Sequence, residues 1–296
     1  MKSTILALVV LFLSIFSAEG VEKNVRKIQN KHGCLVQNFY HGGPNNFLVM
    51  KYLQMMNKKL NYLMKRVKSC EGGGGEGGNN CKKVPKNCAE VLKCGGKKSG
   101  IYKIKPDSKA AFKVYCDQKT NGGGWVVIQK RKDGSVNFFR GWTDYKNGFG
   151  ALKGEFWLGL DKIFRLTHQT RNRLRVELED TKGNTAYAEY SFFAVSSEPN
   201  KYRLSLGTYS GTAGDSLSGH RNAPFSTKDR DNDAHSSGNC AVSYKGAWWY
   251  TSCHGSNLNG LYHHGVHKSY ADGVNWKTWK GYYFSAKRAE MKIRPA

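Results

Sequence analysis

The stretch that decides the fold class is Phe112-Lys-Val-Tyr115, then Asn121-Gly-Gly-Gly124, then Trp125-Val-Val-Ile128. Its first and last parts are rich in β-branched and aromatic residues, which favour strands. The glycine run between them is typical of a turn. We therefore predict two strands here, and we expect the chain around them to form further strands and loops.

A second strand pair is predicted farther along the chain. Leu174-Arg-Val-Glu-Leu-Glu179 alternates apolar and charged residues, and Ala186-Tyr-Ala-Glu-Tyr-Ser-Phe192 follows a turn at 180–184. This alternation predicts a hairpin with one face in water. After about Ser205 the chain is predicted to be mostly loop, and loops that long in a compact domain usually bind something.

The first 20 residues have the pattern of a signal peptide. Lys2 precedes an apolar run from Ile5 to Phe16, and Ala18-Glu-Gly20 offers small residues at a cleavage site. The run is too short to span a bilayer well. We expect a secreted protein with no membrane insertion; a retained signal anchor is the alternative.

A short coiled coil is predicted at 49–68, within an N-terminal segment 21–70. Apolar residues recur there at heptad spacing, which is the pattern of a seam between associating helices. A Gly-rich linker follows at 71–80 and precedes a domain at 81–296. A homo-oligomer is expected; a single amphipathic helix lying on the domain is the alternative. The seam residues are Val49, Leu53, Met56, Leu60, Leu63 and Val67.

Cysteine usage and charge narrow the class of protein. The chain has eight cysteines, and an even number after a signal peptide favours disulfides, while the absence of a CxxC pair argues against structural zinc. Cys34 and Cys70 flank the predicted helix and are equally suited to joining chains or to local pairing.

The net charge is +25, which indicates either solubility or attraction to anionic surfaces. No nucleic-acid-binding motif is present, so nucleic acid is not an expected partner.

Alternating carboxylates predict a metal site. Asp229, Asp231 and Asp233 alternate in one loop, and carboxylates that converge in a curled loop favour Ca²⁺. An EF-hand is excluded because Ala234 and Cys240 stand where that loop needs Gly and Glu. A solvated acidic loop is the alternative.

Aromatic residues are concentrated after Cys240. Core packing explains the tryptophans, but tyrosines place a polar group at a boundary with water. An aromatic pocket with a few polar groups suits an acetamido ligand, which has a methyl group, an N–H and a carbonyl. Histidines here raise the question of catalysis, but no GxSxG or HExxH motif accompanies them, so no enzymatic activity is expected.

A series of short sequence blocks occurs in a characteristic order over about 210 residues of the chain. Together they resemble a fibrinogen-related domain of the ficolin and tachylectin type. The collagen-like repeat of ficolins is missing, which makes the plan closer to tachylectins. The matching blocks are Asn87-Cys-Ala-Glu-Val-Leu92, Ser99-Gly-Ile-Tyr-Lys-Ile104, Val114-Tyr-Cys-Asp117, Gly122-Gly-Gly-Trp-Val-Val-Ile-Gln129, Gly134-Ser-Val136, Gly148-Phe-Gly150, Gly154-Glu-Phe-Trp-Leu-Gly159, Phe225-Ser-Thr-Lys-Asp-Arg-Asp-Asn-Asp233, Asn239-Cys-Ala241, Gly246-Ala-Trp-Trp-Tyr250 and Ser256-Asn-Leu-Asn-Gly260.

The resemblance implies an α+β fold of the fibrinogen C-terminal type. Its central sheet is mixed or antiparallel, and a loop-rich subdomain binds calcium; here the short coiled-coil helix would precede it. It also implies Cys88–Cys116 and Cys240–Cys253 disulfides. Cys94 is then left over, with Cys81 as its expected partner and a free thiol or an intermolecular bond as alternatives.

The resemblance further implies the residues of two sites. Calcium would be held by the carboxylates of Asp231 and Asp233 and by the main-chain carbonyls of His235 and Ser237. A pocket for N-acetyl groups would be formed by Tyr244, Cys253, His254, Tyr270, Ala271 and Tyr282. In fibrinogen the pocket accepts a peptide amino terminus, using an Asp where this chain has Ala271, so a neutral acetyl ligand is expected. A cis peptide before Cys253 is also implied, with the amides of Cys253 and His254 directed at the acetyl oxygen.

The resulting expectation is a secreted, calcium-dependent lectin. It would recognise acetylated, N-acetylglucosamine-like carbohydrates on microbial or cell surfaces and act as an innate immune agglutinin. The alternatives are an angiopoietin-type receptor ligand and a matrix, clotting or venom protein with the same fold.

Overall fold

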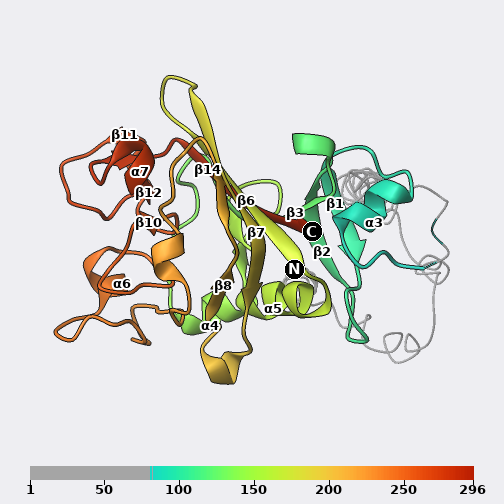
Figure 1. Ribbon diagram of the computed structural model, residues 1–296, viewed down its shortest axis with the longest axis horizontal. Helices are drawn as coiled ribbons and strands as arrows, with labels where there is room; N and C mark the ends of the chain where they lie inside the picture. Colours follow the sequence, from blue (N-terminus) through green and yellow to red (C-terminus); the bar gives the residue numbers. More distant parts are fainter. Residues whose placement is uncertain (1–80, 82) are drawn as a thin grey trace, which may run out of the picture. The chain divides into compact units, whose positions relative to one another are not determined.

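The computed structural model describes residues 81 and 83–296; the predicted signal peptide (1–20), coiled coil (49–68) and linker (71–80) lie outside the described residues. Figure 1 shows the elements of the described domain. Its helices are α3 (Cys88–Lys93), α4 (Trp142–Asn147), α5 (Leu160–Gln169), α6 (Cys240–Ser243) and α7 (Lys277–Lys280), with 3₁₀ turns at Thr120–Gly122, Glu198–Asn200 and Ser218–His220. Its strands are β1 (Gly100–Ile104), β2 (Phe112–Asp117), β3 (Trp125–Arg131), β4 (Phe149–Gly150), β5 (Phe156–Trp157), β6 (Asn172–Glu179), β7 (Thr185–Val195), β8 (Leu204–Leu206), β9 (Tyr209–Gly211), β10 (Ser256–Asn257), β11 (Gly265–Val266), β12 (Asn275–Trp276), β13 (Phe284–Ser285) and β14 (Arg288–Pro295).

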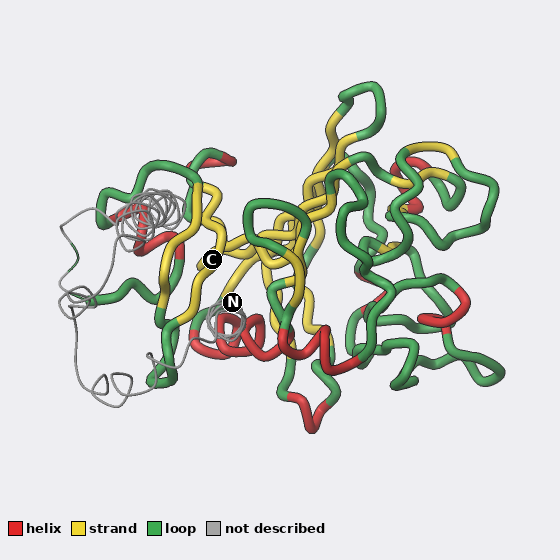
Figure 2. Tube along the Cα trace, turned by 180° about the vertical axis from the view of Figure 1, so that it is seen from behind, coloured by secondary structure: helices red, strands yellow, loops and turns green. Residues whose placement is uncertain are grey.

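One large sheet organises the domain. Its main path runs in the order β1-β2-β3-β14-β6-β7-β8, and neighbouring strands on this path pair antiparallel. The strands predicted around the glycine run are β2 and β3, and the predicted hairpin is β6 and β7, so these predictions are confirmed. The sheet is antiparallel rather than mixed, and the helices make the fold α+β (Figure 2).

The C-terminal strand β14 lies in the middle of the sheet, between β3 and β6. We did not predict this strand from the sequence, although Ala289, Met291 and Ile293 alternate with Glu290 and Lys292 in the same way as the residues of β6. Lys292 is fully buried, with its ammonium 2.7 Å from the carboxylates of Asp117 and Glu177 and 2.9 Å from Glu290. Charge pairing therefore replaces apolar contact on one face of this strand.

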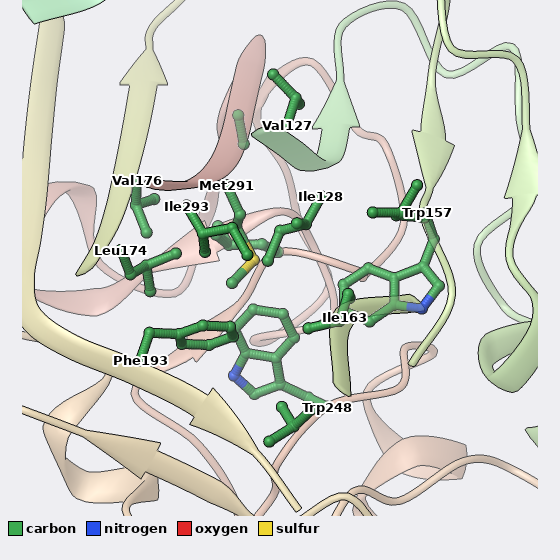
Figure 3. Close-up of a cluster of buried hydrophobic side chains, with 14 of the residues drawn as sticks. Val127, Ile128, Trp157, Ile163, Leu174, Val176, Phe193, Trp248, Met291 and Ile293 are labelled. Carbon is green, nitrogen blue, oxygen red and sulfur yellow. The ribbon is translucent and has the colours of Figure 1, made fainter. Parts of the chain in front are cut away.

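The core fills one face of the sheet and the space beneath the loops. Leu174 and Val176 of β6 and Met291 of β14 point to the same cluster, which includes Trp157 and Trp248 (Figure 3). Helix α5 covers this face because its apolar residues recur at helical spacing, at Leu160, Ile163 and Leu166. The tryptophan at 248 belongs to the core, as expected for the tryptophans of the aromatic-rich region.

The loop-rich part between β9 and β14 contains α6, α7 and two small two-stranded sheets, β10-β12 and β11-β13. The predicted loop region after Ser205 is therefore largely confirmed. Disulfides join Cys88 to Cys116, Cys240 to Cys253 and Cys81 to Cys94. In the part of the chain that the structure describes, no helix is long and apolar enough to cross a membrane.

Candidate functional site

The three alternating aspartates have two different environments. The carboxylate of Asp229 accepts a hydrogen bond from the backbone N–H of Trp142 (2.9 Å) and another from the Thr227 hydroxyl (2.6 Å). It therefore connects this loop to the start of α4. Among the described residues, Asp231 and Asp233 have no such partner outside their own segment, apart from the Cys240 N–H that donates to Asp233 (2.8 Å). Asp229 therefore has a structural role, in contrast to Asp231 and Asp233, which the resemblance implies as calcium ligands.

Asp231 and Asp233 lie side by side. The backbone N–H of Asp233 donates to the Asp231 carboxylate at 3.1 Å. Partial burial raises the pKa of the Asp233 carboxyl above its usual value, and the nearby Asp231 carboxylate adds to that rise. Two carboxylates at such proximity repel each other, so a cation between them would lower the free energy of the loop.

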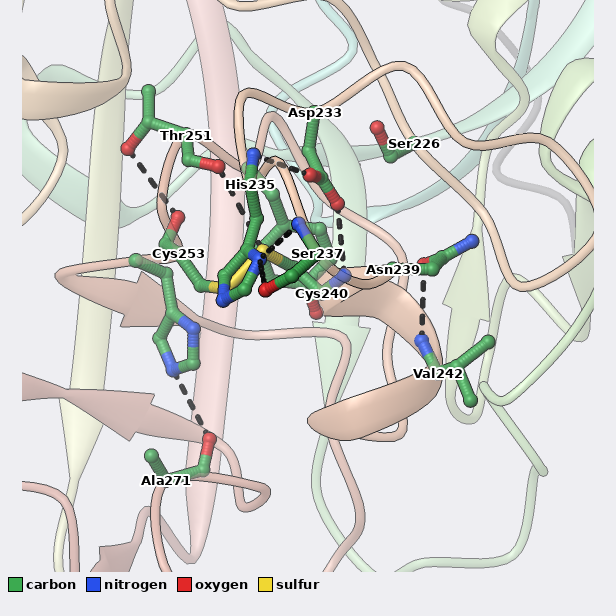
Figure 4. The surroundings of a disulfide bond; sticks show 12 residues. Ser226, Asp233, His235, Ser237, Asn239, Cys240, Val242, Thr251, Cys253 and Ala271 are labelled. Carbon is green, nitrogen blue, oxygen red and sulfur yellow. Dashed lines mark hydrogen bonds between the residues drawn. A yellow bond between two sulfur atoms is a disulfide. The ribbon is translucent and has the colours of Figure 1, made fainter.

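The remaining two groups of the predicted calcium site are main-chain carbonyls. The carbonyl oxygens of His235 and Ser237 accept no hydrogen bond from any residue that the structure describes. Both residues are exposed, and the carboxylate of Asp233 accepts the His235 N–H at 2.8 Å, which curls the segment (Figure 4). All four groups are oxygens within one curled loop, and this donor set fits calcium.

His254 is the centre of the aromatic site, which we define as the six residues predicted for the acetyl pocket. The Tyr244 ring meets its imidazole edge-to-face at 4.6 Å, and the Tyr282 ring does so at 5.7 Å. Its Nε2 lies 3.0 Å from the Ala271 carbonyl oxygen, which makes Nε2 the protonated nitrogen (Figure 4). Burial, and to a lesser degree His220, lowers the pKa of His254 to about 3, so the ring is neutral.

The other members complete the aromatic site. The hydroxyl of Tyr282 donates to the His254 carbonyl at 2.7 Å, and the backbone N–H of Ala271 donates to the Tyr282 carbonyl at 3.2 Å. Tyr270 is about half exposed, and its ring centre is 5.2 Å from that of Tyr282. The structure thus brings together all six residues, which come from four separate segments between Tyr244 and Tyr282.

Two donors in the aromatic site have no acceptor. The backbone N–H groups of Cys253 and His254 donate to no residue that the structure describes. The peptide bond between Ser252 and Cys253 is cis, as the resemblance implies. The Tyr244 hydroxyl likewise has no hydrogen-bond partner among the described residues. Adjacent N–H groups of this kind can both donate to one oxygen atom of a ligand.

Sequence reasoning missed His220, which holds the chain just beyond His254. Its Nδ1 lies 2.7 Å from the Trp249 carbonyl, and its Nε2 accepts the Gly255 N–H at 3.0 Å. Burial lowers the pKa of His220 to about 4, so the neutral ring can accept that hydrogen bond. The residue lies 20 positions before the predicted cysteine pair, and no pattern in the sequence indicated it.

A second group missed by the sequence supports the loop that carries Tyr270. Asp272 lies 2.9 Å from the Nε2 of His263 and 2.7 Å from the Ser269 hydroxyl, and the rings of His263 and His267 stack at 4.3 Å. The sequence analysis considered these histidines only for catalysis. Their contacts instead fix the two ends of the turn that presents Tyr270.

The solved structures most similar to this one include fibrinogen-like domains. The fibrinogen-like globe domain of human ANGPTL2 has a TM-score of 0.70 and 47% identity, covering 71% of this chain and 99% of that one. A lamprey fibrin D-dimer, solved with the peptide Gly-His-Arg-Pro-amide, has a TM-score of 0.68 and 34% identity, covering 85% of this chain and 88% of that one.

Two curated relatives show how far the similarity extends. Fibrinogen C domain-containing protein 1 from Homo sapiens is 54% identical over 214 residues, which is 70% of this chain and 46% of the relative. Ryncolin-4 from Cerberus rynchops is 52% identical over 211 residues, which is 71% of this chain and 61% of the relative. The chain thus spans about half the length of the curated relatives it matches.

Residues 84–296 match the family described as "Fibrinogen beta and gamma chains, C-terminal globular domain". This range contains both the predicted calcium loop and the aromatic site. The chain therefore belongs to the family of fibrinogen C-terminal globular domains.

Proposed function

We propose that this protein is a lectin that recognises the N-acetyl group of carbohydrates. The observation that carries the proposal is the pair of unengaged N–H groups, of Cys253 and His254, beside the tyrosine rings. An acetamido group presents a carbonyl oxygen for these donors and a methyl group for the rings. Its amide and the neighbouring sugar hydroxyls can be reached by the unpartnered hydroxyl of Tyr244.

Ala271 supports a neutral ligand. It is buried, its backbone groups are bonded to His254 and Tyr282, and its side chain carries no charge. The similar lamprey domain was solved with a peptide whose amino terminus is cationic. The site in this chain offers no carboxylate at that position, and His254 is neutral. An acetyl group therefore matches the aromatic site better than an ammonium group does.

In this proposal, calcium holds the loop next to the aromatic site. Asp231, Asp233 and the carbonyls of His235 and Ser237 would bind Ca²⁺, which supplies the positive charge that the two carboxylates need. The Cys240–Cys253 disulfide joins the end of this loop to the aromatic site (Figure 4). Metal binding is thereby proposed to order the segment that presents the Cys253 and His254 amides.

The proposed setting is outside the cell, on microbial or other cell surfaces. Disulfides such as those of the described domain persist in oxidising compartments. One acetyl group offers little contact area, so useful binding would come from several linked domains. The predicted coiled coil at 49–68 supplies such linkage, and agglutination of cells would follow from it.

An angiopoietin-type receptor ligand is the second candidate. The similarity to the fibrinogen-like globe domains of human ANGPTL2 and ANGPTL6, at 47% and 46% identity, favours it. A receptor ligand has no need of an acetyl site, whereas a lectin depends on it. Sugar specificity therefore distinguishes the two candidates.

The test is binding of the full chain to a glycan array and to an acetylated resin. N-acetylglucosamine is expected to elute the protein, while glucose and glucosamine elute it poorly. Equal elution by the three sugars, or no binding to acetylated glycans with calcium present, would contradict the proposal that this protein is a lectin for N-acetyl groups.

A further inference from the structure

The segment from Lys83 to Lys119 is strongly basic and its lysines are unpaired. It contains ten lysines, no arginine and three acidic residues. All ten lysines are exposed, and none forms a salt bridge with a residue that the structure describes. Unpaired lysines at this density raise the local positive potential and have no counter-charge within the described domain.

Two of the three acidic residues of this segment pair with cations outside it. Asp107 forms a bidentate pair with Arg165, and Asp117 is bonded to the buried Lys292. The carboxylate of Glu90 accepts the backbone N–H of Lys86 at 2.7 Å. Two of the three charges are therefore neutralised by partners outside the segment, and only Glu90 remains near the lysines.

Five of the lysines form one surface, which we call the lysine face: Lys83, Lys86, Lys103, Lys105 and Lys113. Lys103 and Lys113 are direct partners across the β1–β2 pair, and like charges at such positions repel each other. Lys105 directly follows β1, and its backbone N–H donates to the Pro85 carbonyl at 2.8 Å, which joins the end of β1 to the segment that carries Lys83 and Lys86. Lys83, Lys86 and Lys105 line one open hollow of about 780 Å³, together with Cys81, Val84, Pro85 and one carboxylate, that of Glu90.

We propose that the lysine face is a second binding site, for a sulfated glycan. The arrangement keeps like charges together at a cost in stability, and a polyanion that contacts several of them would relieve the repulsion. The site is distinct from the aromatic site. Figure 1 shows α3, β1 and β2 at one end of the described domain and α6, β10 and β12 at the other.

The chemistry of the face favours a glycan over nucleic acid and membrane. Bases need open aromatic rings for stacking, but Tyr102 is buried, the Phe112 ring is covered by Arg165 and the Tyr115 ring by Lys130. A membrane-binding surface needs apolar anchors, and Val84 is the one large exposed apolar side chain described in this segment. Sulfate groups need only the ammonium groups that the face provides.

The test uses the full chain on immobilised heparin, eluted with a NaCl gradient. Lys103→Glu/Lys113→Glu should reduce heparin affinity at least tenfold and lower the slope of log K against log[NaCl] by about two, one for each lost contact. The matched control, Lys182→Glu/Lys201→Glu, makes the same charge change at exposed lysines outside the segment. In this control variant, the heparin affinity and the slope of log K against log[NaCl] should change little.

Three results would overturn the proposal. An equal loss in the control variant would show that heparin responds to net charge alone. Displacement of heparin by free N-acetylglucosamine would assign the binding to the aromatic site. Tighter binding of double-stranded DNA than of heparin at equal ionic strength would show that the lysine face binds nucleic acid and not a sulfated glycan. Thermal melting of both variants reports on folding without relying on the acetyl site, so the lysine face is tested independently of the proposed lectin function.

Discussion

The backbone N–H of Ala234 donates a hydrogen bond of 3.1 Å to the carbonyl oxygen of Thr251. Ala234 follows Asp233 of the predicted calcium loop, and Thr251 precedes the Ser252–Cys253 peptide of the aromatic site. The Thr251 N–H in turn donates to the Cys253 carbonyl at 2.7 Å. With the Cys240–Cys253 disulfide, these contacts make the predicted calcium loop and the amides of Cys253 and His254 neighbours that share one backbone network.

Calcium removal is therefore expected to affect both stability and sugar binding. A ligand that binds only the folded state stabilises it, so excess EDTA should lower the melting temperature of the wild-type protein and weaken its retention on acetylated resin. Asp231→Asn should reproduce both effects without chelator. Differential scanning calorimetry and resin binding, with and without Ca²⁺, provide the measurement.

Asp229→Asn is the informative comparison, since this residue lies in the same loop but bonds to Trp142 and Thr227. It should lower the melting temperature while the stabilisation gained from Ca²⁺ persists. Loss of the calcium response in this variant, or unchanged melting of the wild type in EDTA, would contradict the assignment.

The two tyrosine hydroxyls of the aromatic site should behave differently. Tyr282→Phe removes the hydrogen bond to the His254 carbonyl and should cost about 1 kcal/mol of stability, together with a loss of sugar binding. Tyr244→Phe removes a hydroxyl that has no partner in the described domain. It should leave unfolding unchanged and weaken N-acetylglucosamine binding severalfold. Urea unfolding and calorimetric titration would separate the effects; equal destabilisation by both changes would argue against a ligand role for Tyr244.

Acidification should destabilise the domain through two buried histidines. Burial lowers the pKa of His220 to about 4 and that of His254 to about 3, against an ordinary value of 6.5. The unfolded chain therefore binds more protons than the folded one below pH 6.5, and stability falls as the pH decreases toward 4. His220→Gln should flatten this dependence between pH 6.5 and 4, whereas His168→Gln, at an exposed position, should not. An identical pH profile in all three proteins would disprove the mechanism.

The sequence predicted the elements whose signals are local. Alternation in β6 and the glycine run before β3 each indicate a strand without tertiary information. The strand β14 has the same alternation and could have been predicted in the same way, but its central place in the sheet could not, because it depends on ion pairs between Lys292 and residues more than 100 positions away. For the aromatic site, residue types and a family resemblance indicated which residues to expect. The hydrogen bonds of His220 depend on how the loops pack, and no pattern in the sequence predicts them.

The network around Lys292 gives a prediction on stability. Removing one partner of a buried ion cluster leaves the others uncompensated, so Lys292→Met should destabilise the domain by roughly 3–5 kcal/mol. Burial raises the pKa of Glu290, but the cations of Lys292, Arg288 and Lys130 together hold it down to about 2. In the variant the Glu290 pKa should rise, so the loss should be smaller at pH 4 than at pH 7. Urea unfolding at the two pH values checks this; a loss below 1 kcal/mol at pH 7 would show that the cluster contributes little.

Ala271 should determine whether the aromatic site prefers a neutral or a cationic ligand. The residue has a φ of 62° and is buried beside His254 and Tyr282, so a side chain added there enters the site itself. Ala271→Asp introduces a carboxylate among aromatic rings, where it is stable only if a cation pairs with it. The variant should lose at least tenfold in affinity for N-acetylglucosamine and gain measurable affinity for the peptide Gly-His-Arg-Pro-amide, the ligand of the similar lamprey domain.

Ala271→Asn, similar in size and uncharged, controls for steric effects: it should weaken sugar binding without creating peptide binding. Fluorescence titration with the two ligands gives both affinities. Unaltered sugar affinity in the Asp variant would mean that the acetyl group binds elsewhere, because a buried charge at this position cannot leave an adjoining site unaffected.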